Sequence, residues 1–287
     1  MIPRPSSRRP DENFFIVAHD IKYVYEGGIE ALKGVNLRIK SGDFIAIVGG
    51  NGSGKTTLAK NLIGLLRPTS GSVDVAGNRA EKMTVAELAH FVGYAFQNPD
   101  HQLFSGTVEE EVRFGPRNLG MPDAEVSKKA DHAIALMGLQ NLKSEQPLSL
   151  TLGLRRKVSI ASVIAMDPQV IILDEPTTGL DAEEIADLMT SIRALNEEGH
   201  TLILITHDMR LVAQHAKRVI IMANGRILLD SDPPGAFSDL GLLRSSKLEP
   251  PPVTQLAHSL AEFGIPKDIA TAEALVESII SARSGRP

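Results

Sequence analysis

The spacing of apolar and polar residues predicts strands near the start of the chain. Residues Phe14–Tyr25 and Ala31–Lys40 alternate between apolar and polar side chains, and Glu26-Gly27-Gly28 between them is a turn sequence. Phe44–Val48 is a short, unbroken apolar run, which is typical of a strand covered on both faces. A glycine-rich loop and a helical pattern follow this run directly.

Further along the chain, apolar runs and helical patterns take turns. Val170–Leu173 and Thr201–Thr206 have the length of buried strands, and Ala182–Glu198 between them has helical spacing. The other predicted strands are Ser72–Val75, Phe91–Phe96 and Arg218–Ala223. Strands that alternate with helices form a parallel sheet covered by helices, so we predict an α/β core.

Two other regions look helical. Residues 107–143 are predicted to be mostly helical, with breaks at Gly115-Pro116 and Gly120-Met121-Pro122, and a further helix is expected from about 151 to 166. Beyond the prolines at 250–252, two short amphipathic helices close the chain. Short helices of this kind need a surface to cover their apolar side.

Composition narrows the function classes. The chain has 287 residues, 43% of them hydrophobic, so it can bury a sizeable core. The net charge of −5 argues against general affinity for nucleic acid. Because there are no cysteines, disulfides, thiol catalysis and cysteine metal sites are excluded. No apolar run approaches the roughly twenty residues of a membrane helix. We interpret the polar residues 1–13 as a disordered tail.

The glycine-rich loop carries the strongest chemical signal. Residues Gly49–Thr56 match G-x-x-x-x-G-K-S/T and lie between a predicted strand and a predicted helix, the context that this phosphate-binding motif requires. Backbone N–H groups of such a loop wrap a phosphate, Lys55 reaches the β- and γ-phosphates, and the Thr56 hydroxyl holds Mg²⁺. The alternative is an ordinary glycine-rich turn before a helix.

Several polar or aromatic side chains stand near the ends of predicted strands. Asp174 and Glu175 end a buried strand, where a carboxylate suits Mg²⁺ and a second one suits activation of water. His207 and Gln97 also follow strands, at the end where ligands bind in open α/β sheets. Tyr25 precedes the phosphate loop and is able to stack on a purine. Taken singly, each has a plain alternative: a solvated turn, a half-buried histidine or sheet packing.

These features occur in one order between residues 25 and 207, and together they resemble the ATP-binding cassette (ABC) ATPases. The resemblance covers roughly Phe14 to Asp232. It implies an ABC-type P-loop ATPase core, in which a RecA-like parallel sheet is joined to an antiparallel β subdomain and an α-helical subdomain. It also implies ATP and Mg²⁺ as cofactors.

The resemblance assigns roles residue by residue. Glu175, His207 and Gln97 are catalytic, and Thr56, Gln97 and Asp174 hold Mg²⁺. The residues assigned to ATP are Tyr25, Gly49, Asn51, Gly52, Ser53, Gly54, Lys55, Thr56, Thr57, Thr151, Gly153 and Asp181. In the family's terms, Tyr25 stacks on adenine and Gly49–Thr57 is the Walker A loop.

The stretch SLTLGLRRKVSI at 149–160 poses a question of charge. Arg155, Arg156 and Lys157 stand near the start of a predicted helix, where cations are unfavourable unless a negative group is close. In ABC ATPases two domains pair head to tail, and each ATP lies between one Walker A loop and the partner's signature, usually LSGGQ. The family's spacing places that signature at 150–154, so the implied negative group is the γ-phosphate of ATP on the other subunit.

This signature departs from the family pattern. Thr151 keeps the hydroxyl and Gly153 keeps a glycine for close approach to the partner's nucleotide, but Leu152 replaces the first glycine and Leu154 the glutamine. We expect a weakened signature, through backbone strain if Leu152 must be left-handed and through a lost hydrogen bond at Leu154. A lineage variant that works fully as a homodimer is the alternative.

Residues 96–104 (FQNPDHQLF) and 107–119 (TVEEEVRFGPRNL) narrow the resemblance to the ATPase subunits of energy-coupling-factor (ECF) transporters, which import vitamins, cobalt or nickel. That group implies a peripheral protein on the cytoplasmic face of the cell membrane. Its implied partners are a second ABC ATPase in a homo- or heterodimer, a transmembrane subunit and a substrate-binding membrane subunit, without nucleic acid. The expected domains are 14–232, with a helical subdomain at about 98–166, and a helical extension at 233–287 that serves in dimerisation.

Two other functions remain open at this stage. One is a soluble ABC ATPase that acts on nucleic acid or the ribosome, although no coiled coil separates Lys55 from Thr151 and the chain carries only one cassette. The other is a degenerate ATP-binding partner of an active ATPase, which the leucines of the signature favour and the retained Glu175 and His207 oppose.

Overall fold

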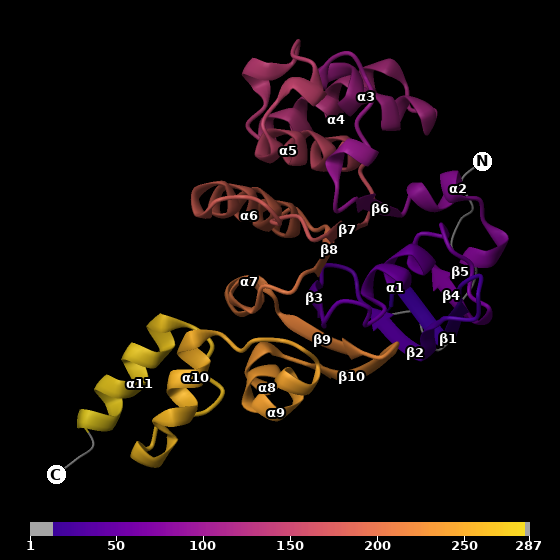
Figure 1. The fold of residues 1–287 in the computed structure, drawn as a ribbon. Helices are drawn as coiled ribbons and strands as arrows, with labels where there is room; N and C mark the ends of the chain where they lie inside the picture. Colours follow the sequence, from indigo (N-terminus) through magenta and orange to yellow (C-terminus); the bar gives the residue numbers. More distant parts are fainter. Residues whose placement is uncertain (1–13, 285–287) are drawn as a thin grey trace.

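The computed structural model describes residues 14–284 and contains two sheets, a helical region and a group of C-terminal helices (Figure 1). The predicted tail at 1–13 lies outside the described residues. The strands are β1 Ile16–Val24, β2 Glu30–Ile39, β3 Phe44–Val48, β4 Ser70–Val75, β5 Asn78–Arg79, β6 Val92–Ala95, β7 Val170–Asp174, β8 Thr201–Ile205, β9 Arg218–Ala223 and β10 Arg226–Ser231.

The larger sheet forms the centre of the fold. Its strand order is β10-β9-β3-β8-β7-β6, and all neighbours except β10 and β9 pair in parallel. Every residue of β3, β7 and β8 is buried, because core clusters cover both faces of these strands. The predicted parallel α/β core is therefore confirmed. The loops that follow β3, β6, β7 and β8 all leave the sheet at the same edge.

The smaller sheet is antiparallel, with the order β2-β1-β4-β5. Sequence analysis missed β5 and β10. Strand β10 lies at the edge of the larger sheet with exposed and half-buried residues in alternation, and its apolar run at 227–229 is only three residues long. Its position comes from the turn at Asn224-Gly225, where φ is 50° and 78°, the geometry of a tight hairpin.

Helices surround the sheets, and α3, α4 and α5 pack together as a separate helical region in the upper part of Figure 1. The first seven helices are α1 Lys55–Leu62, α2 Val85–Ala89, α3 Val108–Asn118, α4 Asp123–Leu136, α5 Leu152–Ile164, α6 Ala182–Glu197 and α7 Met209–His215. The predicted break at Gly115-Pro116 is wrong. Helix α3 continues through Pro116, which is buried in the last turn. The proline lacks the N–H that would bond to the Val112 carbonyl, so packing of its buried ring has to offset that loss.

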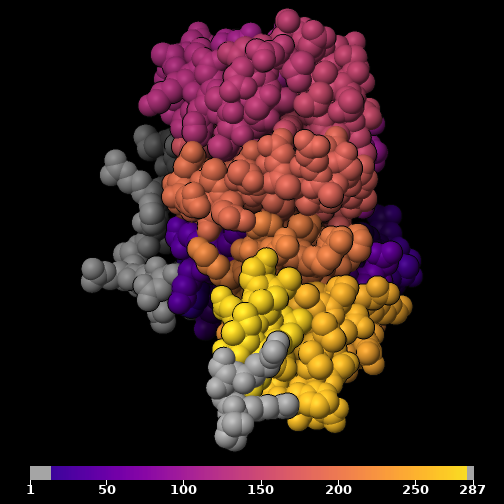
Figure 2. Space-filling model, turned by 90° about the vertical axis from the view of Figure 1, so that its left-hand side faces the viewer, coloured from indigo at the N-terminus to yellow at the C-terminus, as the bar shows by residue number. Residues whose placement is uncertain are grey.

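The C-terminal helices form two layers at the bottom of the molecule (Figures 1 and 2). They are α8 Pro233–Ser238, α9 Leu240–Ser245, α10 Pro252–Ser259 and α11 Ala272–Ser284. Helices α8 and α9 share a core cluster with β9, whereas α10 and α11 share a small core of their own around Ala257 and Leu275. Leu256, Val276 and Ile280 of the last two helices remain exposed. Between residues 14 and 284, no helix is both long and apolar enough to cross a membrane.

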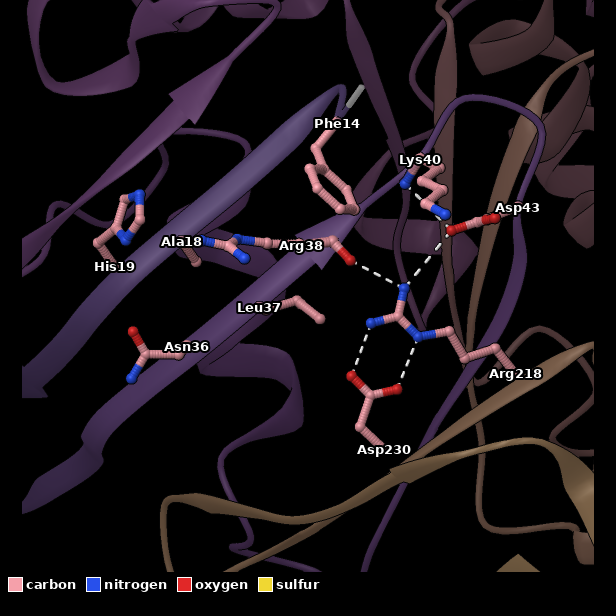
Figure 3. Close-up of a pocket in the computed structure, with 10 residues that line it drawn as sticks. All are labelled: Phe14, Ala18, His19, Asn36, Leu37, Arg38, Lys40, Asp43, Arg218 and Asp230. Atoms are coloured by element: carbon pink, nitrogen blue, oxygen red, sulfur yellow. Dashed lines mark hydrogen bonds and ion pairs between the residues drawn. The ribbon is translucent and has the colours of Figure 1, made fainter. Parts of the chain in front are cut away.

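A hollow of 680 Å³ lies where the two sheets meet, between Phe14, Arg38 and Arg218 (Figure 3). Arg218 crosses this hollow. Its guanidinium donates to both carboxylate oxygens of Asp230 at 2.6 Å and to the Arg38 carbonyl at 2.8 Å. The hydrogen bonds to Asp230 raise the pKa of Arg218 above its ordinary value. None of the predicted site residues lines this hollow, so we interpret it as a junction between the sheets.

Candidate functional site

The phosphate loop connects the central strand β3 to helix α1, as the motif requires. Gly49 has φ 153°, and a Cβ there would lie 2.2 Å from the carbonyl oxygen of Met222 on β9. Gly54 has φ 104° and is the N-cap of α1. Glycine is required at both positions because a side chain would collide or force a strained backbone. The loop therefore presents its backbone at the start of a helix, where anions bind.

Two side chains of this loop, those of Lys55 and Ser53, are suited to bind an anion. Lys55 is buried, and its ammonium donates to the carbonyl oxygens of Gly49 at 2.7 Å and Gly50 at 3.2 Å. Burial lowers the pKa of Lys55, while the carboxylates of Glu175 and Asp174 oppose that shift. The Ser53 hydroxyl is buried and has no hydrogen-bond partner among the described residues. A buried hydroxyl without a hydrogen-bond partner, two residues from a buried cation, is suited to bind a phosphate group.

Asp174 ends β7 directly opposite this loop. Its Oδ2 accepts from the Thr56 hydroxyl at 3.1 Å and from the Tyr94 hydroxyl at 2.5 Å. Hydroxyl and carboxylate oxygens are the ligands that Mg²⁺ takes beside substrate phosphates, so these residues fit the implied ion. Tyr94, on β6, was missed by sequence analysis because nothing in its buried strand distinguishes it from a core residue. Burial raises the pKa of its hydroxyl, which keeps the group neutral as a donor.

Glu175 and His207 meet at the ends of β7 and β8. The Glu175 Oε1 lies 2.9 Å from His207 Nδ1, and the Glu175 side chain is 12% exposed against 67% for His207. Glu175 has φ 48°, a left-handed conformation that costs about 1–2 kcal/mol in a non-glycine residue. Strain of this kind persists where the surrounding structure enforces it, and it concentrates at functional sites. Here the backbone N–H of Glu175 donates to Ile205 at 2.8 Å.

Tyr25 lies at the phosphate loop, whereas Gln97 contacts the signature helix through Arg156. The Tyr25 hydroxyl is 3.0 Å from the Thr57 hydroxyl, and its ring packs edge-on against Tyr23 with centroids 4.9 Å apart. It therefore stands beside the phosphate loop with part of its ring exposed. Gln97 follows β6 with an exposed side chain, and its carbonyl accepts a short hydrogen bond from Arg156.

The signature segment lies at the start of α5 and faces the start of α6. Thr151 is the N-cap of α5 and accepts from the Leu154 N–H at 3.4 Å. A Cβ on Gly153 would lie 2.3 Å from Oε1 of Glu184, a residue of α6 in the same chain. Gly153 thus lies against the Glu184 carboxylate, and its close approach to the partner's nucleotide stays a prediction. Asp181 is the N-cap of α6 and accepts from the N–H groups of Glu183 and Glu184.

We expected backbone strain at Leu152 to weaken the signature, and this expectation is wrong. Leu152 lies inside α5 and does not have a positive φ. Its side chain instead reaches Gly179, where a Cβ would lie 2.9 Å from Leu152 Cδ2. Leu154 is half-buried and packs against the core cluster of the helical region. Only the missing polar side chain at Leu154 remains as a reason for weakness.

The three cations of the signature helix all have partners in their own chain. Arg155 lies 3.1 Å from Asp100, and Lys157 forms a short ion pair with Asp187. Carboxylates and carbonyl oxygens of the same chain therefore face these cations, and an effect on the partner's phosphate stays a prediction.

Arg156 is the buried member of the three. It donates to the carbonyl oxygens of Phe96, Gln97 and Thr178, and burial lowers its pKa. It thereby ties the segment after β6 to the loop after β7. No short-range sequence signal distinguished it from its two neighbours.

The predicted site residues form two separate groups. Tyr25, the loop 49–57, Asp174, Glu175 and His207 surround the ends of the central strands. Thr151, Gly153 and Asp181 meet at the facing starts of α5 and α6 through Glu184. Within residues 14–284, no hydrogen bond or ion pair joins these three to the phosphate loop. The two groups, which the family resemblance assigns to two halves of an ATP site, thus lie in different places of the chain (Figure 1).

Comparison with known proteins gives consistent matches. The family described as ABC transporter matches residues 32–178. The Energy-coupling factor transporter ATP-binding protein EcfA of Methanoculleus marisnigri is 41% identical over 93% of this chain and 97% of its own. An ABC transporter ATP-binding protein of Caldanaerobacter subterraneus is 44% identical over 89% of this chain, but the match spans only 46% of that longer relative.

A solved structure agrees with these matches. CbiO1 of Clostridium perfringens, described as part of the ABC transporter complex cbiONQ, superposes with a TM-score of 0.74 at 35% identity. The superposition covers 87% of this chain and all of the other.

Proposed function

This chain belongs to the ABC transporter family of ATP-binding proteins, and from that premise we propose that it is the ATP-hydrolysing subunit of an ECF-type importer. It would energise uptake of a micronutrient, a vitamin or a transition-metal ion, through separate membrane subunits at the cytoplasmic face. The name of the M. marisnigri relative and the full-length superposition on CbiO1 support this assignment. The contact of Glu175 with His207, opposite the phosphate loop, carries the catalytic part of the proposal.

The residues have the following proposed roles in hydrolysis. Lys55 and the backbone of the phosphate loop bind the β- and γ-phosphates, and Tyr25 stacks on the base. Thr56, Asp174 and Gln97 hold Mg²⁺, which neutralises negative charge on the phosphates. Glu175 accepts a proton from the attacking water, and His207 holds the Glu175 carboxylate in place.

The two half-sites support a dimer. Because the signature group and the phosphate loop lie apart in one chain, we propose that each ATP is closed by the signature of a second ABC ATPase in head-to-tail pairing. The exposed Leu256, Val276 and Ile280 of the C-terminal extension support its role in that pairing.

The segment after Gln97 supports docking on a membrane subunit. Phe104 is 61% exposed, and its ring packs edge-on against Phe114 with centroids 4.7 Å apart. The buried Glu111 accepts from the N–H groups of Phe104 and Ser105 at 2.9 and 2.7 Å, so the aromatic pair is held in place. An ordered, exposed aromatic pair is a suitable anchor for a helix of a partner.

Gln102, in the same segment, faces inward. Its side-chain amide bonds Ser159 and Ser162 of α5, and its oxygen accepts from the Ser159 hydroxyl at 2.7 Å. It links the docking segment to the signature helix. A probe for the partner therefore belongs at Phe104.

The docking proposal predicts capture of an integral membrane protein. A photoreactive amino acid in place of Phe104 should cross-link such a protein in native membranes, because this side chain lies on the proposed docking surface. The matched control is the same substitution at Leu228, an equally apolar, exposed residue on β10. Capture from position 104 of soluble proteins alone, or the same products from both positions, would contradict the docking proposal.

A further inference from the structure

Helix α9 ends in an unusual way directly beside the phosphate loop. The N–H of Lys247 donates to the Arg244 carbonyl at 3.0 Å and that of Leu248 to the Leu243 carbonyl at 2.9 Å. This pair of bonds is the Schellman motif, in which the residue after the cap is left-handed. Glycine is the usual residue there, yet here it is Lys247, with φ 57°.

A lysine at this position needs an explanation, because glycine adopts the same backbone without strain. One ordinary reason is a positive charge at the negative end of a helix. The last turn of α9 already carries Arg244, which supplies that charge from a right-handed, exposed position. Another ordinary reason is an ion pair, but no carboxylate of the described residues pairs with Lys247.

The side chain of Lys247 lies across the phosphate loop. A Cβ placed on Gly50 would be 2.9 Å from Lys247 Cβ and 3.2 Å from its Cδ, so the lysine stem runs along this glycine. A backbone hydrogen bond holds this contact in place, because the Gly50 N–H donates to the Ser246 carbonyl at 3.0 Å. The buried Leu248 anchors the same segment in the core.

Gly50 is also the neighbour of the cation that the motif provides. Its carbonyl oxygen accepts from the Lys55 ammonium at 3.2 Å. Lys247 is exposed at its tip, whereas its stem is held on the loop, which leaves the flexible ammonium free to reach a phosphate bound there. The C-terminal extension thus brings a second lysine to the loop that binds the phosphates.

We propose that Lys247 is a further phosphate-binding residue of the nucleotide site, supplied by the C-terminal extension and directed at the terminal phosphate of ATP. The inference rests on the proposed function. It explains why this Schellman motif carries lysine, and why position 50 is a glycine: any Cβ there would displace the lysine stem.

The test is isothermal titration calorimetry of the full chain with ATP and with ADP, in EDTA so that no hydrolysis occurs. Lys247→Gln should bind ATP about tenfold more weakly, the loss of one hydrogen bond to a charged group at a half-open site. ADP affinity should fall by less than about threefold, because the terminal phosphate is absent. Lys247→Arg should bind ATP like the parent, since it keeps the charge.

Two further variants separate the side chain from the backbone. Lys247→Gly keeps the left-handed turn without strain and should lose ATP affinity as Lys247→Gln does. Arg244→Gln removes a cation from the same turn and should leave affinity unchanged. ATP binding by Lys247→Gln within twofold of the parent, or an equal loss for ATP and ADP, would overturn this inference alone. A parent chain that binds no ATP would overturn the proposed function and this inference with it.

Discussion

Replacement of Glu175 by Gln is expected to lower ATP turnover by about 10²–10⁴-fold, the range that a general base contributes. The carboxylate is almost buried, sits 2.9 Å from His207 and lies on a strained backbone opposite the phosphate loop. Glutamine has the same shape but does not accept a proton. ATP affinity should therefore change little, because the Lys55 and Thr56 contacts remain.

The control for this variant is Glu183→Gln, which removes an exposed carboxylate at the start of α6. Its turnover should match the parent. Steady-state ATPase assays with Mg²⁺, together with a binding titration, measure both quantities. Turnover of Glu175→Gln within threefold of the parent would refute the assignment of Glu175 as the base.

Replacement of Leu154 by Gln is expected to raise ATP turnover of the purified chain about two- to tenfold. A glutamine here supplies one hydrogen bond across the dimer interface, worth about 0.5–1.5 kcal/mol. The structure limits the gain to this residue, because Leu152 has an unstrained helical backbone. Leu152→Gly is expected to add nothing and would remove the contact with Gly179.

The matched control is Leu154→Met, which keeps an apolar side chain and should leave turnover unchanged. Because Leu154 packs against the helical core, the thermal midpoint of each variant should be measured beside its activity. Unchanged or lower turnover in a stably folded Leu154→Gln variant would show that the signature serves the site as it stands. The homodimer alternative would then hold.

The central strands and the phosphate loop were accessible from sequence because both are local signals. β3 and β7 are apolar runs, and the loop has a fixed spacing of glycines and one lysine. β10 was missed because its apolar run at 227–229 is only three residues long. The helix through Pro116 was missed because its burial, not its local sequence, decides the outcome.

The site was predictable in its members but not in all its contacts. Tyr94 bonds Asp174, which is 80 positions away in the sequence, and Arg156 bonds Phe96, which is 60 positions away. No short-range sequence pattern predicts such contacts. The contact of Gly153 with Glu184, which reaches it from another helix, was equally hidden. In each case the partner is set by tertiary packing.

The most direct test of the central claim, an ATPase subunit that works on membrane partners, is the composition of the native complex. The full chain, tagged and purified in mild detergent from membranes of cells that make it naturally, is analysed by mass spectrometry for its stoichiometric partners. We predict a second ABC ATPase chain, identical or related, with at least one protein that has several membrane-spanning helices. Ribosomal proteins or nucleic acid as the stoichiometric partners, with no integral membrane protein, would contradict the account.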